Sequence, residues 1–261
     1  MADTGDVAAV AAAAAAAAEA SARPAGNAQP LAGRVAIVTG ASRGIGCAIA
    51  THLSSLGASV VLGYASRADE ADALAASLPR AVAVRADVTD EAGARSLFDA
   101  AESAFGGGAH ILVANAGVMD DTYPAVADTT TEAFDRVLAV NRLPRGGRGR
   151  IVAVTSSVVG SLPPRYAAYT ASKAAVEALV RTMAKELRGT RVTANCVAPG
   201  ATATDMFFDG KSEDMVRRAV EICPMERLGE PGDIAPVVGF LCTDAAEWVN
   251  GQVIRANGGY V

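Results

Sequence analysis

The chain reads Val35-Ala36-Ile37-Val38-Thr39-Gly40-Ala41-Ser42-Arg43-Gly44-Ile45-Gly46, an apolar run followed directly by three spaced glycines. An apolar run without polar alternation is typical of a strand that is buried on both faces of a sheet. Beyond Ile45, apolar residues recur at helical spacing at Ile49 and Leu53. The stretch therefore predicts a strand, a tight glycine turn and a helix.

The same alternation continues to the end of the chain. Further strands are expected at 60–62, 81–85, 111–113, 151–154, 192–197 and 252–255, and helices at about 67–78, 90–104, 129–141, 166–188 and 231–243. Strands of this kind separated by helices indicate a parallel sheet that is covered on both faces. The predicted fold class is α/β, a single doubly wound parallel sheet, whose ligands bind beyond the carboxyl ends of the strands.

Charge and composition exclude several kinds of partner. The formal net charge of the 261 residues is −5, which favours neither nucleic acid nor a membrane surface as a partner. The four cysteines show no Cys-x-x-Cys spacing, and the two histidines, His52 and His110, are isolated. We therefore predict no metal site and a reducing intracellular compartment, the cytoplasm.

The first thirty residues differ in composition from the rest. Val7 to Ala22 is mostly alanine, and a Pro/Gly/Asn/Gln stretch then ends at Pro30. An isolated helix of this length is marginal in water, so we expect 1–30 to be a disordered Ala-rich leader and 31–261 to be the folded domain. A chloroplast transit peptide is the alternative, although three acidic residues precede the first basic residue, Arg23.

The glycine turn has the spacing of a nucleotide-binding loop. Gly40, Gly44 and Gly46 lie between a predicted strand and a predicted helix. Glycines let the backbone approach a pyrophosphate, while the helix N-terminus offers unpaired N–H groups and a positive dipole end. This context predicts a dinucleotide site.

The end of the second strand bears on the choice of dinucleotide. NAD-preferring enzymes place a carboxylate there, whereas this chain has Gly63-Tyr64-Ala65-Ser66-Arg67, which contains no acid. Arg43, together with Ser66 or Arg67, can hold a 2′-phosphate. We predict a preference for NADPH (NADP⁺) over NADH, the alternative being a solvated arginine pair on a turn.

Tyr169-Thr170-Ala171-Ser172-Lys173 lies in the predicted helix at 166–188. Residues four apart emerge from the same helix face, so Lys173 is expected beside Tyr169. A phenol has a pKa of roughly 10, and a neighbouring ammonium favours the phenolate and lowers that pKa. Proton exchange with an alcohol oxygen is therefore predicted.

Two further motifs complete a known pattern, Asn115-Ala116-Gly117 and Pro199-Gly200. With them, the chain resembles the short-chain dehydrogenase/reductase family over about 31–261. More narrowly, the segments 184–187, 206–211 and 248–252 are similar to those of plant NADPH-dependent aldehyde reductase-like proteins, to which bacterial 3-oxoacyl-acyl-carrier-protein reductases are related. The resemblance implies a Rossmann-type sheet.

The resemblance also implies catalytic roles. Tyr169 is then the general acid, Lys173 lowers the pKa of Tyr169 and binds the nicotinamide ribose, and Ser157 hydrogen-bonds the carbonyl oxygen. The cofactor supplies the hydride. Ser156 competes with Ser157 for the serine role.

The cofactor-binding residues implied by the resemblance and by the turn follow five of the predicted strands or lie in the helix at 166–188. They are Gly40, Ser42, Arg43, Gly44, Ile45, Gly46, Tyr64, Ser66, Arg67, Asp87, Val88, Asn115, Ala116, Gly117, Tyr169, Lys173, Pro199, Gly200 and Thr204. Asp87 and Val88 are expected at the adenine end. The same run is also a good helix start, with Thr89 or Asp90 as the cap.

The stretch after Asn141 departs from the family, in which an asparagine midway along a long helix joins the proton relay. Here Pro144 and several glycines follow at once, and they cannot continue a helix. The family's stretch is longer by about fourteen residues, roughly 21 Å of helix. Asn141 is either the fourth catalytic residue or the match of an asparagine at the helix end. That helix packs across the family's dimer interface, so we expect a weakened homodimer or homotetramer.

The predicted function is NADPH-dependent reduction of an aldehyde or ketone to the alcohol. Met206, Phe207 and Phe208 lie in a stretch, 201–228, that is predicted to form a substrate-covering loop and a short helix. These residues favour a small apolar carbonyl substrate, or else they pack the closed loop. The alternatives are a 3-oxoacyl-acyl-carrier-protein reductase and a catalytically impaired NADPH-binding protein.

Overall fold

The computed structural model describes residues 29–119 and 149–261. Most of the predicted leader, the helix expected at 129–141 and the shortened segment after Asn141 therefore lie outside the described residues. The boundary between leader and domain at residue 31 stays a prediction.

The described strands form one parallel sheet. They are β1 (Val35–Thr39), β2 (Ser59–Tyr64), β3 (Ala81–Arg85), β4 (Ile111–Ala114), β5 (Arg150–Val154), β6 (Thr193–Pro199) and β7 (Val253–Ala256). Their spatial order is β3-β2-β1-β4-β5-β6-β7, and every neighbouring pair is parallel. The chain winds outward from β1 in one direction and from β4 in the other, so the predicted doubly wound sheet is confirmed.

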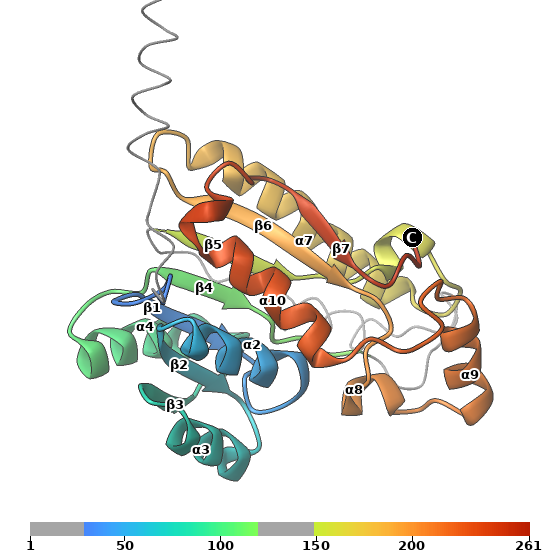
Figure 1. Cartoon of the computed structure of the whole chain (residues 1–261), viewed down its shortest axis with the longest axis horizontal. Helices are drawn as coiled ribbons and strands as arrows, with labels where there is room; N and C mark the ends of the chain where they lie inside the picture. The colour runs from blue at the N-terminus through green and yellow to red at the C-terminus, as the bar shows by residue number, and fades with distance from the viewer. Residues whose placement is uncertain (1–28, 120–148) are drawn as a thin grey trace, which may run out of the picture.

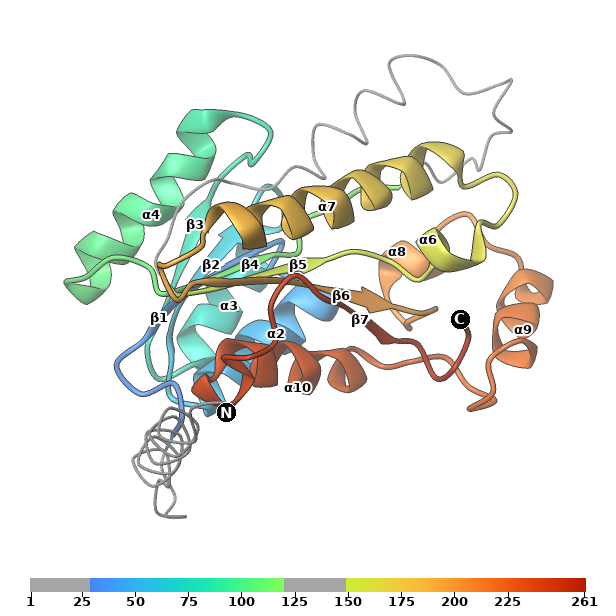
Figure 2. The ribbon, with the colours of Figure 1, turned by 90° about the horizontal axis from the view of Figure 1, so that it is seen from above.

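Helices cover both faces of this sheet. They are α2 (Gly44–Ser55), α3 (Ala68–Ser77), α4 (Glu91–Phe105), α6 (Val158–Ser161), α7 (Ala167–Glu186), α8 (Asp205–Phe208), α9 (Glu213–Glu221) and α10 (Pro231–Cys242), with a short 3₁₀ helix at Asp244–Ala246. Figures 1 and 2 show α2, α3 and α10 on one face and α4 and α7 on the other. None of these described helices combines the length and the apolar character that crossing a bilayer requires.

The core lies between these layers. Leu53 of α2 and Ile234 of α10 are buried in one apolar cluster with Val60 of β2. On the other face, Leu97 of α4 packs with Ile37. Burying a side chain of this size stabilises the fold by about 1.5–3 kcal/mol, so both layers fix the sheet and the loops at its edge.

The carboxyl ends of the strands share one edge of the sheet. The glycine loop follows β1, and α8 and α9 project beyond the same edge (Figure 1). The predicted substrate-covering stretch thus forms two short helices where a loop and one helix were expected. Functional residues from distant parts of the sequence meet at this edge.

Candidate active site

A cavity of about 1230 Å³ lies at this edge. Ligand pockets for drug-sized molecules span roughly 300–1,000 Å³, so this cavity has room for a dinucleotide together with a small substrate. Apart from Arg67, every described residue predicted to bind the cofactor or to act in catalysis lines it. Asn141 lies outside the described residues.

Two glycine positions of the loop, Gly40 and Gly46, leave no room for a side chain. A Cβ atom on Gly46 would lie 2.1 Å from the carbonyl oxygen of Gly40, and Gly40 itself has a φ of +64°. The N-cap of α2, Arg43, makes no side-chain capping hydrogen bond to the helix, and no acidic residue stands in the first turn. These features fit a phosphate group that approaches the backbone N–H groups of a helix N-terminus.

Asn115 holds this loop from the neighbouring strand. Its side-chain amide donates to the carbonyl oxygens of Thr39 at 2.9 Å and Gly40 at 3.1 Å, and its backbone N–H donates to Thr39 Oγ1 at 3.0 Å. Both hydrogen bonds that the Asn115 amide nitrogen donates therefore go to the backbone at the start of the loop. Asn115 therefore positions the loop and also lines the cavity.

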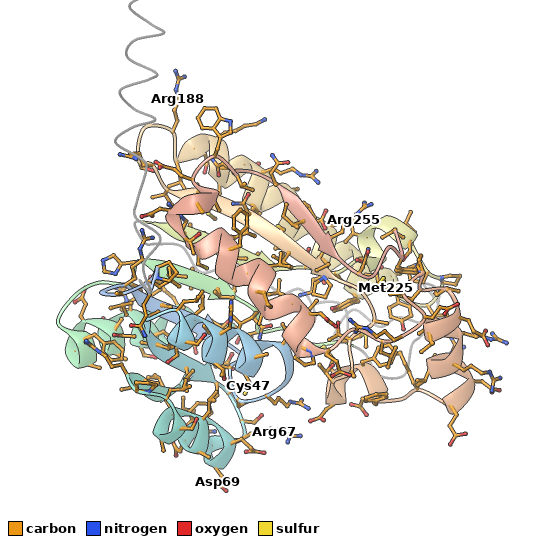
Figure 3. The ribbon with its side chains drawn as sticks, viewed as in Figure 1. Cys47, Arg67, Asp69, Arg188, Met225 and Arg255 are labelled. Atoms are coloured by element: carbon orange, nitrogen blue, oxygen red, sulfur yellow. The ribbon has the colours of Figure 1, made fainter. Side chains whose placement is uncertain are left out.

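Two arginines meet at one carboxylate beside the loop. Arg43 Nη1 lies 2.6 Å from Asp205 Oδ2, and Arg67 Nη2 lies 3.6 Å from the same oxygen. Figure 3 shows the Arg67 side chain at the start of α3. The hydrogen bond and charge of Arg43, followed by the charge of Arg67, lower the pKa of Asp205. Two convergent guanidinium groups are a donor set that suits a phosphate.

Asp87, which is predicted to lie at the adenine end, lines the cavity. Its Oδ1 atom accepts hydrogen bonds from the backbone N–H of Thr89 at 2.9 Å and from Thr89 Oγ1 at 2.7 Å. The predicted helix start is also present, because Asp90 accepts from the backbone N–H of Gly93 at 2.6 Å and caps α4. Asp87 thus lines the cavity, and Asp90 is the cap.

Tyr169 and Ser156 form the polar end of the cavity. The side chain of Ser156 hydrogen-bonds the Tyr169 hydroxyl, and both residues line the cavity. Burial raises the pKa of Tyr169 to about 12, although the hydrogen bond from Ser156 lowers it in part. The phenol is therefore protonated at neutral pH and able to donate.

Ser157 also lines the cavity, but its hydroxyl bonds to other groups of the protein. Its hydroxyl donates to the carbonyl oxygen of Ala198 at 3.0 Å and accepts from Asn257 Nδ2 at 2.9 Å. The side chain is buried between the ends of β5 and β6. In this structure the hydrogen-bond partner of the Tyr169 hydroxyl is Ser156, the alternative that the sequence had left open. Which of the two serines acts in catalysis stays a prediction.

Lys173 lies one helical turn from Tyr169, as expected from the spacing. Its Nζ atom donates to the carbonyl oxygen of Val154 at 3.0 Å and lies 5.6 Å from the centre of the Tyr169 ring. Burial lowers the pKa of Lys173 to about 8. Burial disfavours the charged form of both groups, and the lowering of the tyrosine's pKa by Lys173 stays a prediction.

Replacing Lys173 by methionine should change how stability depends on pH. The unfolded lysine has a pKa near 10.5 and the folded one about 8, so the unfolded chain binds the extra proton between these values. Lysine then costs the folded state about 3 kcal/mol below pH 8, and this cost disappears as the pH rises toward 10.5. The unfolding free energy of wild type minus that of Lys173→Met, from urea titrations, should rise over this window; a constant difference would contradict a buried ammonium.

Comparison with known proteins identifies this arrangement. A family profile described as enoyl-(acyl carrier protein) reductase matches residues 40–261. The NADPH-dependent aldehyde reductase-like protein, chloroplastic, of Arabidopsis thaliana is 51% identical, over 89% of this chain and 96% of its own. The chain belongs to the short-chain dehydrogenase/reductase family. It is an oxidoreductase that acts on CH–OH or carbonyl groups.

Solved short-chain dehydrogenase/reductase structures share the fold. The 3-ketoacyl-(acyl-carrier-protein) reductase from Brucella melitensis, complexed with NADH, has a TM-score of 0.80 at 29% identity and covers 88% of this chain and 99% of its own. The angucycline C-6 ketoreductase LanV, with bound NADP, has a TM-score of 0.81 at 34% identity, over 88% and 96% of the two chains. A nicotinamide cofactor therefore belongs to this site.

The alignment with the Arabidopsis aldehyde reductase-like protein also bears on chain length. It runs over 258 residues but takes in 89% of the 261 residues here. The relative therefore holds residues that have no counterpart in this chain. The shortening expected after Asn141 and the role of Asn141 stay predictions.

Proposed function

We propose that this protein reduces an aldehyde or ketone to the alcohol with NADPH, and that Tyr169 is the general acid. The observation that carries the proposal is a protonated, buried phenol, hydrogen-bonded to Ser156, in the same cavity as the glycine cradle. A carbonyl oxygen that gains electrons needs a proton donor within hydrogen-bond reach. A phenol that is protonated at neutral pH meets this need in the direction of reduction.

Each of the predicted site residues has its own role in the proposed reaction. The cradle of Gly40, Gly44 and Gly46 binds the pyrophosphate, and bound NADPH supplies the hydride. Ser156 and Tyr169 hold the carbonyl oxygen, and their donors act mainly on the transition state, where negative charge develops on that oxygen. Tyr169 then transfers its proton to the oxygen, and Lys173 lies beside its ring to favour the phenolate that is left.

A preference for NADPH over NADH is part of the proposal. Arg43 and Arg67 converge on one anionic oxygen, and the segment from Gly63 to Arg67 contains no acid that would repel a 2′-phosphate. The name of the Arabidopsis relative supports the same choice. Fluorescence titration should give a Kd for NADPH at least tenfold below that for NADH; equal values would remove the assigned role of the arginines.

The proposed substrate is a small apolar carbonyl compound. Apolar side chains of α8, α9 and the following loop line the cavity, namely Met206, Phe207, Met215, Ile222 and Met225. Loss of the nicotinamide absorbance with a panel of medium-chain aldehydes and ketones tests this. Turnover of 3-oxoacyl-carrier substrates alone would favour the second candidate, which the Brucella structure supports, and binding without turnover would favour an impaired protein.

The two serines should respond differently to removal of their hydroxyls. Ser156→Ala removes a donor from the reacting oxygen and should lower kcat/KM by about 10²–10³-fold, as for other donors of this kind. Ser157→Ala breaks bonds to Ala198 and Asn257, so it should mainly lower the unfolding free energy, by about 1–3 kcal/mol. Steady-state kinetics and urea titration of both variants check this assignment, and the reverse pattern would restore Ser157 to the catalytic role.

Assembly and location follow the relatives. We infer a homodimer or homotetramer, which sedimentation of the full chain would test; a monomer at micromolar concentration would contradict it. The name of the Arabidopsis relative includes "chloroplastic", so we favour the chloroplast over the cytoplasm. Residues 1–30 fused to a fluorescent protein should then enter plastids in plant cells, and a cytoplasmic signal would contradict this.

A further inference from the structure

Asp205 stands where the two arginines of the proposed 2′-phosphate site converge. Its Oδ2 atom lies 2.6 Å from Arg43 Nη1 and 3.6 Å from Arg67 Nη2. Arg43 belongs to the glycine loop after β1, and Arg67 belongs to the N-cap of α3 after β2. Three segments that are distant in sequence thus share one carboxylate oxygen. Asp205 is hydrogen-bonded to Arg43 and ion-paired with Arg67, which also contacts Glu70 at 3.2 Å through its other terminal nitrogen.

The carboxylate is placed by the segment that leads to the substrate end. Thr204 is the N-cap of α8, and its side chain accepts from the backbone N–H of Phe207. The Thr204 methyl group would lie 3.2 Å from a Cβ atom on Gly44, so this segment rests against the glycine loop. Met206 and Phe207, which follow Asp205, line the cavity. The position of α8 is therefore tied to the arginines.

The ion pairs of Asp205 with Arg43 and Arg67 are weak enough for a phosphate to replace the carboxylate. Asp205 and both arginines are largely solvent-exposed, and ion pairs of this kind are worth only about 0.2–1 kcal/mol. A phosphate carries up to two negative charges and several acceptor oxygens, so it is a stronger partner for two guanidinium groups than one carboxylate. The carboxylate and a 2′-phosphate at the same place would also repel each other.

We propose that Asp205 is an internal substitute for the 2′-phosphate: it holds Arg43 and Arg67 in place and is displaced by that phosphate, which releases α8. The proposal rests on the proposed function, since it needs the arginine pair to receive the 2′-phosphate. It adds that Asp205 lowers the affinity for phosphorylated cofactors. It also links cofactor binding to the segment that covers the substrate.

Asp205→Asn tests the competition. Adenosine 2′,5′-bisphosphate and 5′-AMP differ only in the 2′-phosphate, and calorimetry with the full chain gives the Kd of each. The variant should bind the bisphosphate roughly three- to tenfold more tightly than wild type and 5′-AMP within about twofold. Asp99→Asn is the matched control, because it removes the same charge from an exposed position on α4, and it should leave both Kd values unchanged.

Hydrogen exchange of backbone amides tests the release of α8. Hydrogen exchange of the backbone amides at 205–209 should become faster in wild type when the bisphosphate is added, and should not change with 5′-AMP. Slower exchange, or an unchanged or weaker Kd for the bisphosphate in Asp205→Asn, would overturn the proposal. If wild type still prefers NADPH in that case, the proposed function stands and only displacement fails; if wild type binds no nicotinamide nucleotide, both fail.

Discussion

Tyr169→Phe should lower the kcat/KM of carbonyl reduction by about 10²–10⁴-fold, the usual contribution of a positioned general acid. The substitution removes only the hydroxyl that Ser156 contacts and keeps the ring beside Lys173. Steady-state kinetics with a reactive aldehyde measure the loss. The Kd of NADPH, from fluorescence titration, should stay within about threefold of the wild-type value, because the glycine cradle is unchanged.

Tyr166→Phe is the matched control for this prediction. Tyr166 lines the same cavity, but Thr170 occupies the position one helical turn further along, where Tyr169 has Lys173. Removing its hydroxyl should change kcat/KM by no more than a few-fold. Equal losses in the two variants, or a Tyr169→Phe enzyme as fast as wild type, would refute Tyr169 as the proton donor.

Where sequence reasoning succeeded, the signal was local. The apolar runs and the helical patterns between them placed each described strand within two residues of its observed bounds. Strands that are buried on both faces have continuous apolar sequences, which are easy to recognise. The glycine loop was likewise predictable, since Gly40 has a positive φ and Gly46 has no room for a Cβ atom, and both conditions require glycine.

The polar partners in the site were less predictable. Which of two adjacent serines faces a tyrosine depends on the twist of the chain as it leaves β5, and Asp205 meets Arg43 from 162 positions away. The pKa of Tyr169 depends on how deeply α7 buries it, which spacing alone does not reveal. The sequence placed a lysine one helical turn from the phenol, whereas the burial that raises the pKa of Tyr169 became visible only in the structure.

Gly46→Ala should abolish tight binding of the cofactor. The new Cβ atom would lie 2.1 Å from the Gly40 carbonyl oxygen and 2.5 Å from Asn115 Nδ2, distances at which the loop must move. Moving it breaks the hydrogen bonds of Asn115 and turns the N–H groups of α2 away from the pyrophosphate. We expect the Kd of NADPH to rise at least about 100-fold, and the unfolding free energy to fall by about 1–3 kcal/mol, as in other overpacked sites.

Gly232→Ala separates this effect from a general cost of replacing glycine in a helix. Gly232 lies near the start of α10, and nothing stands within 4 Å of a Cβ atom placed there. Alanine should therefore leave NADPH binding unchanged and stabilise the helix by up to about 1 kcal/mol. Fluorescence titration gives the Kd of NADPH for both variants, and urea unfolding gives their unfolding free energies. If Gly46→Ala binds NADPH within threefold of wild type, the phosphates do not rest on this loop, because no rearrangement that keeps the cradle can also admit the methyl group.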